Sequence, residues 1–214
     1  VHSEPVFVGA PNPNLYRSST FTGATAYAAF AATQATRAQR LYTGANDGML
    51  HAFDATNGNE SWAFVPSTAI GPGLRAFTLP DYEHNYNLDG ELTVADVYLA
   101  GAWKTILVGT QGRGTPGVFA LDVTDPANPR FLWEVSGTTL TSLGNNIGKP
   151  IIAQVANGQW RVLLGNGRRH GATAGRGVGH LPRGEGFVHG CHGLLGQVDI
   201  EHATRFGHGG PSQI

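Results

Sequence analysis

Residues 40–65 read RLYTGANDGMLHAFDATNGNESWAFV, and residues 104–135 read KTILVGTQGRGTPGVFALDVTDPANPRFLWEV. Both stretches run as a strand, a Gly-rich turn, a strand that ends in Ala-x-Asp, a polar turn and a strand that carries Trp. A repeated unit of a few strands is the signature of a propeller blade, which buries its faces only against its neighbours. We therefore expect an all-β fold, a partial β-propeller of about two and a half blades that is incomplete as a folding unit.

The first copy carries the spacing A-x-D-x-x-x-G-x-x-x-W at Ala52, Asp54, Gly58 and Trp62. This is the docking motif of quinoprotein-type propellers, so we expect blades of that type. A small Ala lets two sheets approach, and the Asp can accept backbone N–H groups in the following turn. The Gly supplies a positive φ, and the Trp presents a large apolar surface to the next blade. The motif therefore indicates an architecture and says little about chemistry.

The second copy keeps Ala120, Asp122 and Trp133, but its turn is lengthened to DVTDPANP and contains no glycine. Apolar runs between Gly-rich and Pro-rich turns complete the strand prediction. The expected strands are residues 5–9, 40–45, 49–54, 61–65, 92–99, 103–110, 117–123, 131–135, 150–155 and 160–165. Residues 23–39 are Ala-rich with Tyr27 and Phe30 three apart, so they are expected to form one inserted helix.

The bulk composition limits the class of protein. The chain has 214 residues, with 14 basic and 15 acidic side chains and a net charge of -1. These charges are scattered along the chain, which argues against nucleic acid as a partner. No apolar stretch approaches the roughly 20 residues that span a bilayer, so we expect no transmembrane segment. Because the chain begins at Val1, we expect an internal piece of a longer protein whose secretion signal lies upstream.

Four segments together carry a resemblance to a known family: VHSEPVFVG, LYTGANDGMLHAFDATNG, GVFALDVTDPANPRFLWEV and LGNNIGKPIIAQVANGQWRVLLGNG. In this order, over residues 1–167, they resemble the β-propeller of PilY-type type IV pilus assembly and tip-adhesin proteins. The resemblance implies an extracytoplasmic protein of the periplasm, outer membrane or pilus tip that supports pilus assembly, twitching motility and surface attachment. It also implies minor pilins and a host or abiotic surface as partners.

Members of this family bind calcium through an Asp-rich loop of the type D-x-D/N-x-D, whose oxygen ligands suit a hard cation. The present sequence contains no such run. The nearest candidates are Asp122 with Asp125 and Asp81 with Asp89, and both pairs lack the alternating spacing. We therefore assign no metal ligand and expect no cofactor in this chain.

Residues 168–214 depart from the pattern, because they are rich in Gly and His and contain no Trp, Tyr or Lys. No strand alternation survives in this tail, so we expect it to be either a disordered linker or the product of a frameshift in a GC-rich gene. Cys191 is the only cysteine of the chain, which excludes an internal disulfide. His189, Cys191 and His192 offer borderline-soft ligands for zinc or copper, but their spacing matches no standard structural zinc pattern.

Catalytic signals in the sequence are weak. Gly112, Gly114 and Gly117 spell the dinucleotide pattern G-x-G-x-x-G, but a strand follows them instead of a helix, which favours a hairpin loop. Residues 81–91, DYEHNYNLDGE, group carboxylates with a His, and a polar loop between blades explains them better than acid–base chemistry. We therefore expect no enzyme and no catalytic residue. The alternative is a fragment of a pyrroloquinoline quinone-dependent dehydrogenase, which shares the docking motif but needs calcium ligands and a catalytic Asp.

Overall fold

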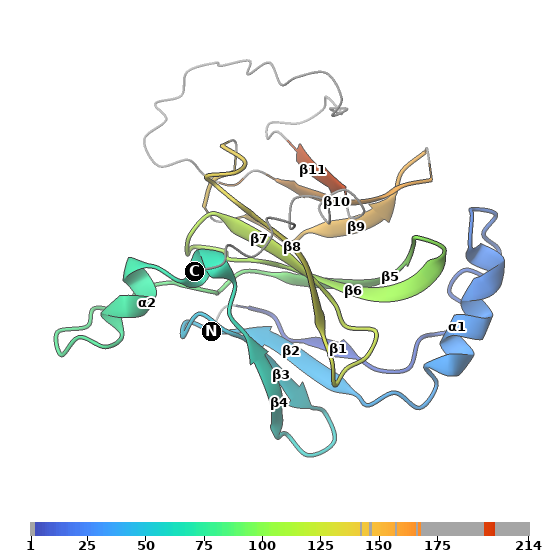
Figure 1. Cartoon of the computed structure of the whole chain (residues 1–214), viewed down its shortest axis with the longest axis horizontal. Coiled ribbons are helices and arrows are strands. Elements are labelled where there is room, and N and C mark those ends of the chain that lie inside the picture. Colours follow the sequence, from blue (N-terminus) through green and yellow to red (C-terminus); the bar gives the residue numbers. More distant parts are fainter. Residues whose placement is uncertain are drawn as a thin grey trace, which may run out of the picture.

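The computed structural model describes residues 3–141, 143–145, 147–156, 158–165, 167 and 195–199. These residues form three antiparallel sheets in which strands that follow one another in the chain are hydrogen-bonded neighbours. The sheets are arranged in chain order, with the second sheet in the middle (Figure 1). The predicted all-β architecture with few helices is confirmed.

The first sheet contains β1 (Val6–Val8), β2 (Arg40–Gly44), β3 (Leu50–Asp54) and β4 (Glu60–Phe64). The second contains β5 (Leu92–Leu99), β6 (Ala102–Thr110), β7 (Gly117–Asp122) and β8 (Arg130–Ser136). The third contains β9 (Ile151–Gln154), β10 (Trp160–Gly165) and β11 (Leu195–Asp199). The short helical elements are η1 (Ala24–Ala26), α1 (Tyr27–Thr33), η2 (Ser67–Ala69) and α2 (Pro72–Ala76). The predicted strands 92–99 and 160–165 coincide with β5 and β10, and the other predicted strands differ by one residue at one or both ends.

The second sheet buries both of its faces, and its side chains alternate between two apolar clusters. Ile106 and Val108 belong to the cluster shared with the third sheet and α1, whereas Leu107 and Phe119 belong to the cluster shared with the first sheet. Successive residues of a strand point to opposite faces, so a central strand is apolar at consecutive positions. This is why β6 and β7 are buried almost throughout. The middle sheet therefore makes two separate apolar interfaces.

The helix inserted between β1 and β2 is shorter than the prediction of residues 23–39. It ends at Thr33, and Gln34 leaves helical geometry at φ -100° and ψ 8°. A β-branched Thr lowers helix propensity, and the Thr33 hydroxyl donates a hydrogen bond back to the preceding turn. The two short helical elements between β4 and β5 were not predicted. Within the described residues, no helix is both long and apolar enough to cross a membrane.

Aromatic contacts fasten α1 to the second sheet. Trp103 stacks on Tyr16 with ring centroids 4.9 Å apart, and packs edge-on against Tyr27 at 4.7 Å. Its indole Nε1 donates to the carbonyl of Gly23 over 2.8 Å. The Tyr27 hydroxyl donates to Asp96 Oδ2 over 2.6 Å. The insertion is therefore held by specific polar bonds as well as by apolar packing.

One described strand lies in the tail, where the sequence shows no strand alternation. β11 pairs antiparallel with β10, with Val198 opposite Val162. Pairing with an open sheet edge requires extended backbone and no apolar pattern, so this strand does not follow from the residue pattern. The candidate ligands His189, Cys191 and His192 lie outside the described residues, as does the rest of the tail.

Candidate interaction surface

The two copies of the docking motif adopt the same local geometry. Ala52 lies opposite Trp62 in the β3–β4 pair, and Ala120 lies opposite Trp133 in the β7–β8 pair. In both pairs the register shifts directly after the Ala. Ala52 belongs to the apolar cluster between the first and second sheets, and Ala120 to the cluster between the second and third. Each small side chain therefore lies at the contact with the following sheet.

An Asp organises the turn that follows the first of these Ala residues. Asp54 Oδ1 accepts hydrogen bonds from the hydroxyl and the backbone N–H of Thr56, and Asp54 Oδ2 lies 3.2 Å from Arg40 Nη1. The bonds from Thr56 hold the pKa of Asp54 below its ordinary value, and Arg40 adds to this effect. Gly58 closes the turn at φ 77°, a conformation that favours glycine.

The second copy repeats this arrangement with a longer turn. Asp122 Oδ1 accepts bonds from the hydroxyl and N–H of Thr124, and Asp122 Oδ2 lies 3.0 Å from Lys104 Nζ. Asp125 then accepts a hydrogen bond from Asn128 Nδ2 over 2.9 Å and another from the backbone N–H two residues further along the chain over 3.0 Å. The hydrogen bond from Asn128 is the main reason why the pKa of Asp125 lies below its ordinary value. Side chains thus close this turn where the first copy uses a glycine.

The Trp of the first copy reaches the turn of the next sheet. Trp62 Nε1 donates to the carbonyl oxygen of Pro126 over 2.9 Å. Trp133 is only 3% exposed, and its Nε1 has no hydrogen-bond partner among the described residues. The seven motif residues therefore lie at turns and at sheet contacts.

The connection between β4 and β5 is fastened at both of its ends. Near its start, the Glu134 carboxylate accepts the first two backbone N–H groups of η2 over 2.9 and 2.8 Å. Near its end, Asn87 Nδ2 donates to the carbonyl of Asn46 over 2.7 Å. Asp89 Oδ1 accepts the backbone N–H of Arg113 over 2.8 Å. This connection is therefore held by the β2–β3 and β6–β7 hairpins and by β8.

The acidic residues and the His within residues 81–91 differ in burial. Asp89 is buried and holds the β6–β7 hairpin, whereas Asp81, Glu83 and His84 are exposed. Among the residues that the structure describes, no group of three His, Cys, Asp or Glu side chains could hold a metal ion. The arrangement is that of a structural loop.

The glycine pattern is a hairpin loop, as predicted. Gly112 and Gly114 lie between β6 and β7, and Gly117 is the first residue of β7. Gln111 closes the loop, because its N–H donates to the Gly117 carbonyl and its carbonyl accepts from Gly114, each over 3.0 Å. A strand follows the loop, so no helix N-terminus is present to bind a phosphate.

His51 of β3 lies between two carboxylates that sequence reasoning did not group with it. Its Nδ1 is 2.6 Å from Glu60 Oε1, and its Nε2 is 2.9 Å from Asp47 Oδ2. A neutral imidazole carries only one N–H, so both contacts are donated only by the charged ring. Burial opposes that charge, but the bonds to Glu60 and Asp47 outweigh burial and raise the pKa of His51 above its ordinary value.

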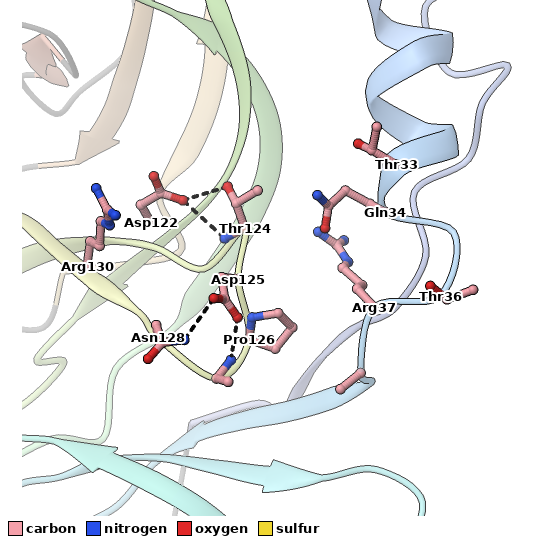
Figure 2. A pocket seen from close by; sticks show the side chains of 12 residues that line it. Thr33, Gln34, Thr36, Arg37, Asp122, Thr124, Asp125, Pro126, Asn128 and Arg130 are labelled. Carbon is pink, nitrogen blue, oxygen red and sulfur yellow. Dashed lines mark hydrogen bonds between the residues drawn. The ribbon is translucent and has the colours of Figure 1, made fainter.

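A cleft of about 580 Å³ opens between the C-terminal end of α1 and the β7–β8 turn. Figure 2 shows polar side chains from both walls around it. The helix side contributes Thr33, Gln34, Thr36 and Arg37, and the turn side contributes Asp122, Thr124, Asp125, Asn128 and Arg130. The sequence signal for this site is faint, because the two walls lie far apart in the chain.

Antiparallel sheets that pack face to face, with a Trp of one sheet docked on a turn of the next, define a domain of the β-propeller class. The chain belongs to the PilY1 β-propeller family, since the family model described as "PilY1 beta-propeller domain" matches residues 1–178. The resemblance inferred from the four sequence segments is thereby confirmed, and the match extends past residue 167.

Several curated proteins are similar to this chain. A type IV pilus biogenesis factor PilY1 homolog of Xylella fastidiosa is 56% identical over 168 residues, which is 78% of this chain and 14% of that protein. PilY1 of Pseudomonas aeruginosa is 44% identical over 170 residues, again 78% and 14%. The crystal structure of the P. aeruginosa PilY1 C-terminal domain superposes with a TM-score of 0.56 at 48% identity, covering 66% of this chain and 27% of that one. The chain thus spans a small part of these relatives.

Proposed function

We propose that this chain is a non-catalytic propeller module of an extracytoplasmic type IV pilus biogenesis factor, where it supports pilus assembly, twitching motility and surface attachment. The observation that carries the proposal is 56% identity over 168 residues to a relative named as a type IV pilus biogenesis factor. Its proposed partners are minor pilins at the pilus tip and a host or abiotic surface. The proposed location is the periplasm, the outer membrane or the pilus tip.

Three carboxylates already engaged in hydrogen bonds or ion pairs within the chain support a non-catalytic role. Asp54 and Asp122 are each held by a Thr and by a cation of a neighbouring strand. Asp89 holds a backbone N–H. A general acid or base must instead reach a reacting group. The quinone-dependent dehydrogenase is not favoured, because the curated relatives are pilus biogenesis factors.

Exchange into a relative tests the proposed function. The matching segment of P. aeruginosa PilY1 is replaced by residues 3–165 of this chain, in a strain that lacks its own PilY1. Because that relative is 44% identical, we expect surface pili and twitching to be restored. The same exchange with Trp62→Ala, which removes the docking indole, is expected to fail. A chimera that accumulates to the level of native PilY1 and yet restores no pili would overturn the proposal.

The division of the chain into a propeller over residues 1–167 and a tail over residues 168–214 stays a prediction, as does the origin of the tail. The nucleotide sequence tests it directly. If the tail is a frameshift product, another reading frame will encode a strand and turn that continue the third sheet. A homologous tail read in frame in an independent isolate would exclude the frameshift.

A further inference from the structure

Two segments that depart from the repeated sheet unit meet at one cleft. The β5–β6 connection is a tight turn of Ala100 and Gly101, whereas the equivalent β1–β2 connection carries α1. The β3–β4 turn closes at Gly58, whereas the β7–β8 turn is extended around Pro126. These two added segments form the walls of the cleft of about 580 Å³ (Figure 2). Neither addition is needed to build a sheet, so the cleft is a feature beyond the repeat.

Hydrogen bonds within the chain fix both walls. On the helix side, Arg37 Nε donates to the carbonyl of Gly9 over 2.5 Å, and Arg37 Nη1 donates to the hydroxyl of Thr105 over 2.7 Å. On the turn side, the carbonyl of Pro126 accepts the indole N–H of Trp62. A preformed site avoids the cost of ordering its walls on binding, and this volume falls in the range of ligand pockets.

The carboxylates of the cleft are already engaged. Asp122 binds Thr124 with one oxygen and Lys104 with the other. Both oxygens of Asp125 accept hydrogen bonds within its own turn. A cation would have to displace these bonds, so the cleft does not suit one.

The groups that stay available are amides, a hydroxyl and a guanidinium. The side chains of Gln34, Thr36 and Arg130 make no hydrogen bond to the described part of the chain, and Asn128 uses only its Nδ2 there. Arg130 acts on Asp125 through its charge alone, which leaves its N–H groups able to donate. A carboxamide offers the donor and the acceptor that a peptide group requires. A guanidinium pairs with a carboxylate through parallel hydrogen bonds. No aromatic ring belongs to the described lining, so the face of a sugar has nothing to stack on.

We propose that this cleft binds an extended polypeptide segment that presents an acidic side chain to Arg130. Gln34 and Asn128, on opposite walls, pair with peptide groups of the bound segment, and Thr36 supplies a further hydroxyl. The inference rests on the proposed function and deepens it, because it names the chemistry by which a protein partner in pilus assembly is held.

Titration of the full-length chain into a fluorescein-labelled peptide of repeating Gly-Ser-Glu units tests the inference by fluorescence anisotropy. Control peptides carry Gln or Lys in place of Glu, and N-acetylglucosamine serves as a competitor that reports saccharide binding. Arg130→Glu is expected to raise the Kd for the Glu peptide about tenfold, because a charge-assisted hydrogen bond is lost. Gln34→Ala is expected to raise it about threefold.

Arg75→Glu is the matched control. Arg75 is exposed on α2, on the other side of the molecule from α1 in Figure 1, and its replacement by Glu makes the same change of charge as Arg130→Glu. We expect it to leave the Kd unchanged, and circular dichroism to show that all three variants are folded. Equal binding of the Glu and Gln peptides, an unchanged Kd in Arg130→Glu, displacement by N-acetylglucosamine, or no binding of any peptide would each overturn the inference.

The chimera in P. aeruginosa PilY1 separates this inference from the proposed function. If Arg130→Glu in the chimera leaves pilus assembly intact, the cleft is not the partner site and the proposed function stands. If the unmodified chimera restores no pili although the acidic peptide binds through Arg130, the proposed function fails and the chemistry of the cleft stands.

Discussion

The indole Nε1 of Trp62 donates a hydrogen bond to the carbonyl oxygen of Pro126 over 2.9 Å, across the contact between the first and second sheets. Trp62 belongs to β4, and Pro126 lies in the turn after β7. The same indole packs on the ring of Tyr42, with centroids 5.6 Å apart. One side chain thus contributes both apolar area and a polar bond to the sheet contact.

Replacement of Trp62 by Phe separates these two contributions. Because the ring is largely kept and the N–H is lost, we expect the free energy of unfolding to fall by about 1 kcal/mol. Trp62→Ala, which also removes the ring, is expected to lower it by about 3 kcal/mol. Urea unfolding followed by circular dichroism measures both. Ser61→Ala, on the exposed side of β4, is the control and should be close to neutral. A Trp62→Phe variant as stable as the wild type would show that the hydrogen bond contributes nothing.

Two buried tyrosines should respond in different directions to loss of the hydroxyl. The Tyr27 hydroxyl donates to Asp96, whereas the Tyr42 hydroxyl has no partner among the described residues. We expect Tyr27→Phe to lower the free energy of unfolding by about 1–3 kcal/mol, because Asp96 loses a donor. Tyr42→Phe should leave it unchanged or raise it by up to about 1 kcal/mol. Thermal unfolding of the two variants side by side makes the comparison, and the reverse order would contradict it.

Because the pKa of His51 is raised, we expect the free energy of unfolding to fall as the pH rises. Its pKa is raised in the folded state, so the folded chain binds more protons than the unfolded chain. The contribution is fully present below about pH 6.5, the ordinary value for His, and is lost as the pH rises through the raised pKa. Urea unfolding over a series of pH values measures the slope. Above about pH 5, Asp54 and Asp125 stay charged because their pKa values are lowered, so they add nothing to it.

His51→Gln should remove this component of the slope, because Gln carries no titrating proton. His84→Gln, at an exposed position, is the control and should keep the slope of the wild type. An identical pH dependence in the His51→Gln and wild-type chains would show that titration of His51 does not cause the slope.

Gly90 and Gly71 lie in the same connection between β4 and β5 and should differ sharply in their tolerance of Ala. A Cβ at Gly90 would lie against the carbonyl oxygen of Thr110 and 2.5 Å from the backbone N of Gly112, neither of which can move freely. A Cβ at Gly71 meets no described atom within 4 Å. We expect Gly90→Ala to cost about 1–3 kcal/mol, and Gly71→Ala to be tolerated. Comparison of the two urea midpoints tests this, and equal midpoints would mean that the hairpin yields.

The strands could be read from the sequence because each carries its own pattern. In β5 and β10, successive side chains alternate between the two faces of the sheet, and turn residues mark the ends of both strands. The helix at residues 23–39 could not be bounded in the same way. Its end is set by Thr33 and by the bonds of Arg37 to Gly9 and the second sheet, and those partners are distant in sequence.

The candidate site was less accessible to sequence reasoning than the fold. The docking motif places Trp62 at a sheet contact, but the sequence does not say that Pro126 accepts its N–H. The side chains of His51, Asp47 and Glu60 come together only through the register of β3 with β4 and the shape of the turn before β3. The cleft requires the turn of the second sheet to lie against a helix inserted in the first. The lengthened turn and the inserted helix were each predicted, but nothing in the sequence places them side by side.

The bond from Trp62 to Pro126 has a direction, because the donor precedes the acceptor in the chain. The first sheet therefore makes this polar contact only after the second sheet has been synthesised. In a chain that is synthesised and exported from its N-terminus, the order of emergence is then also the order of completion.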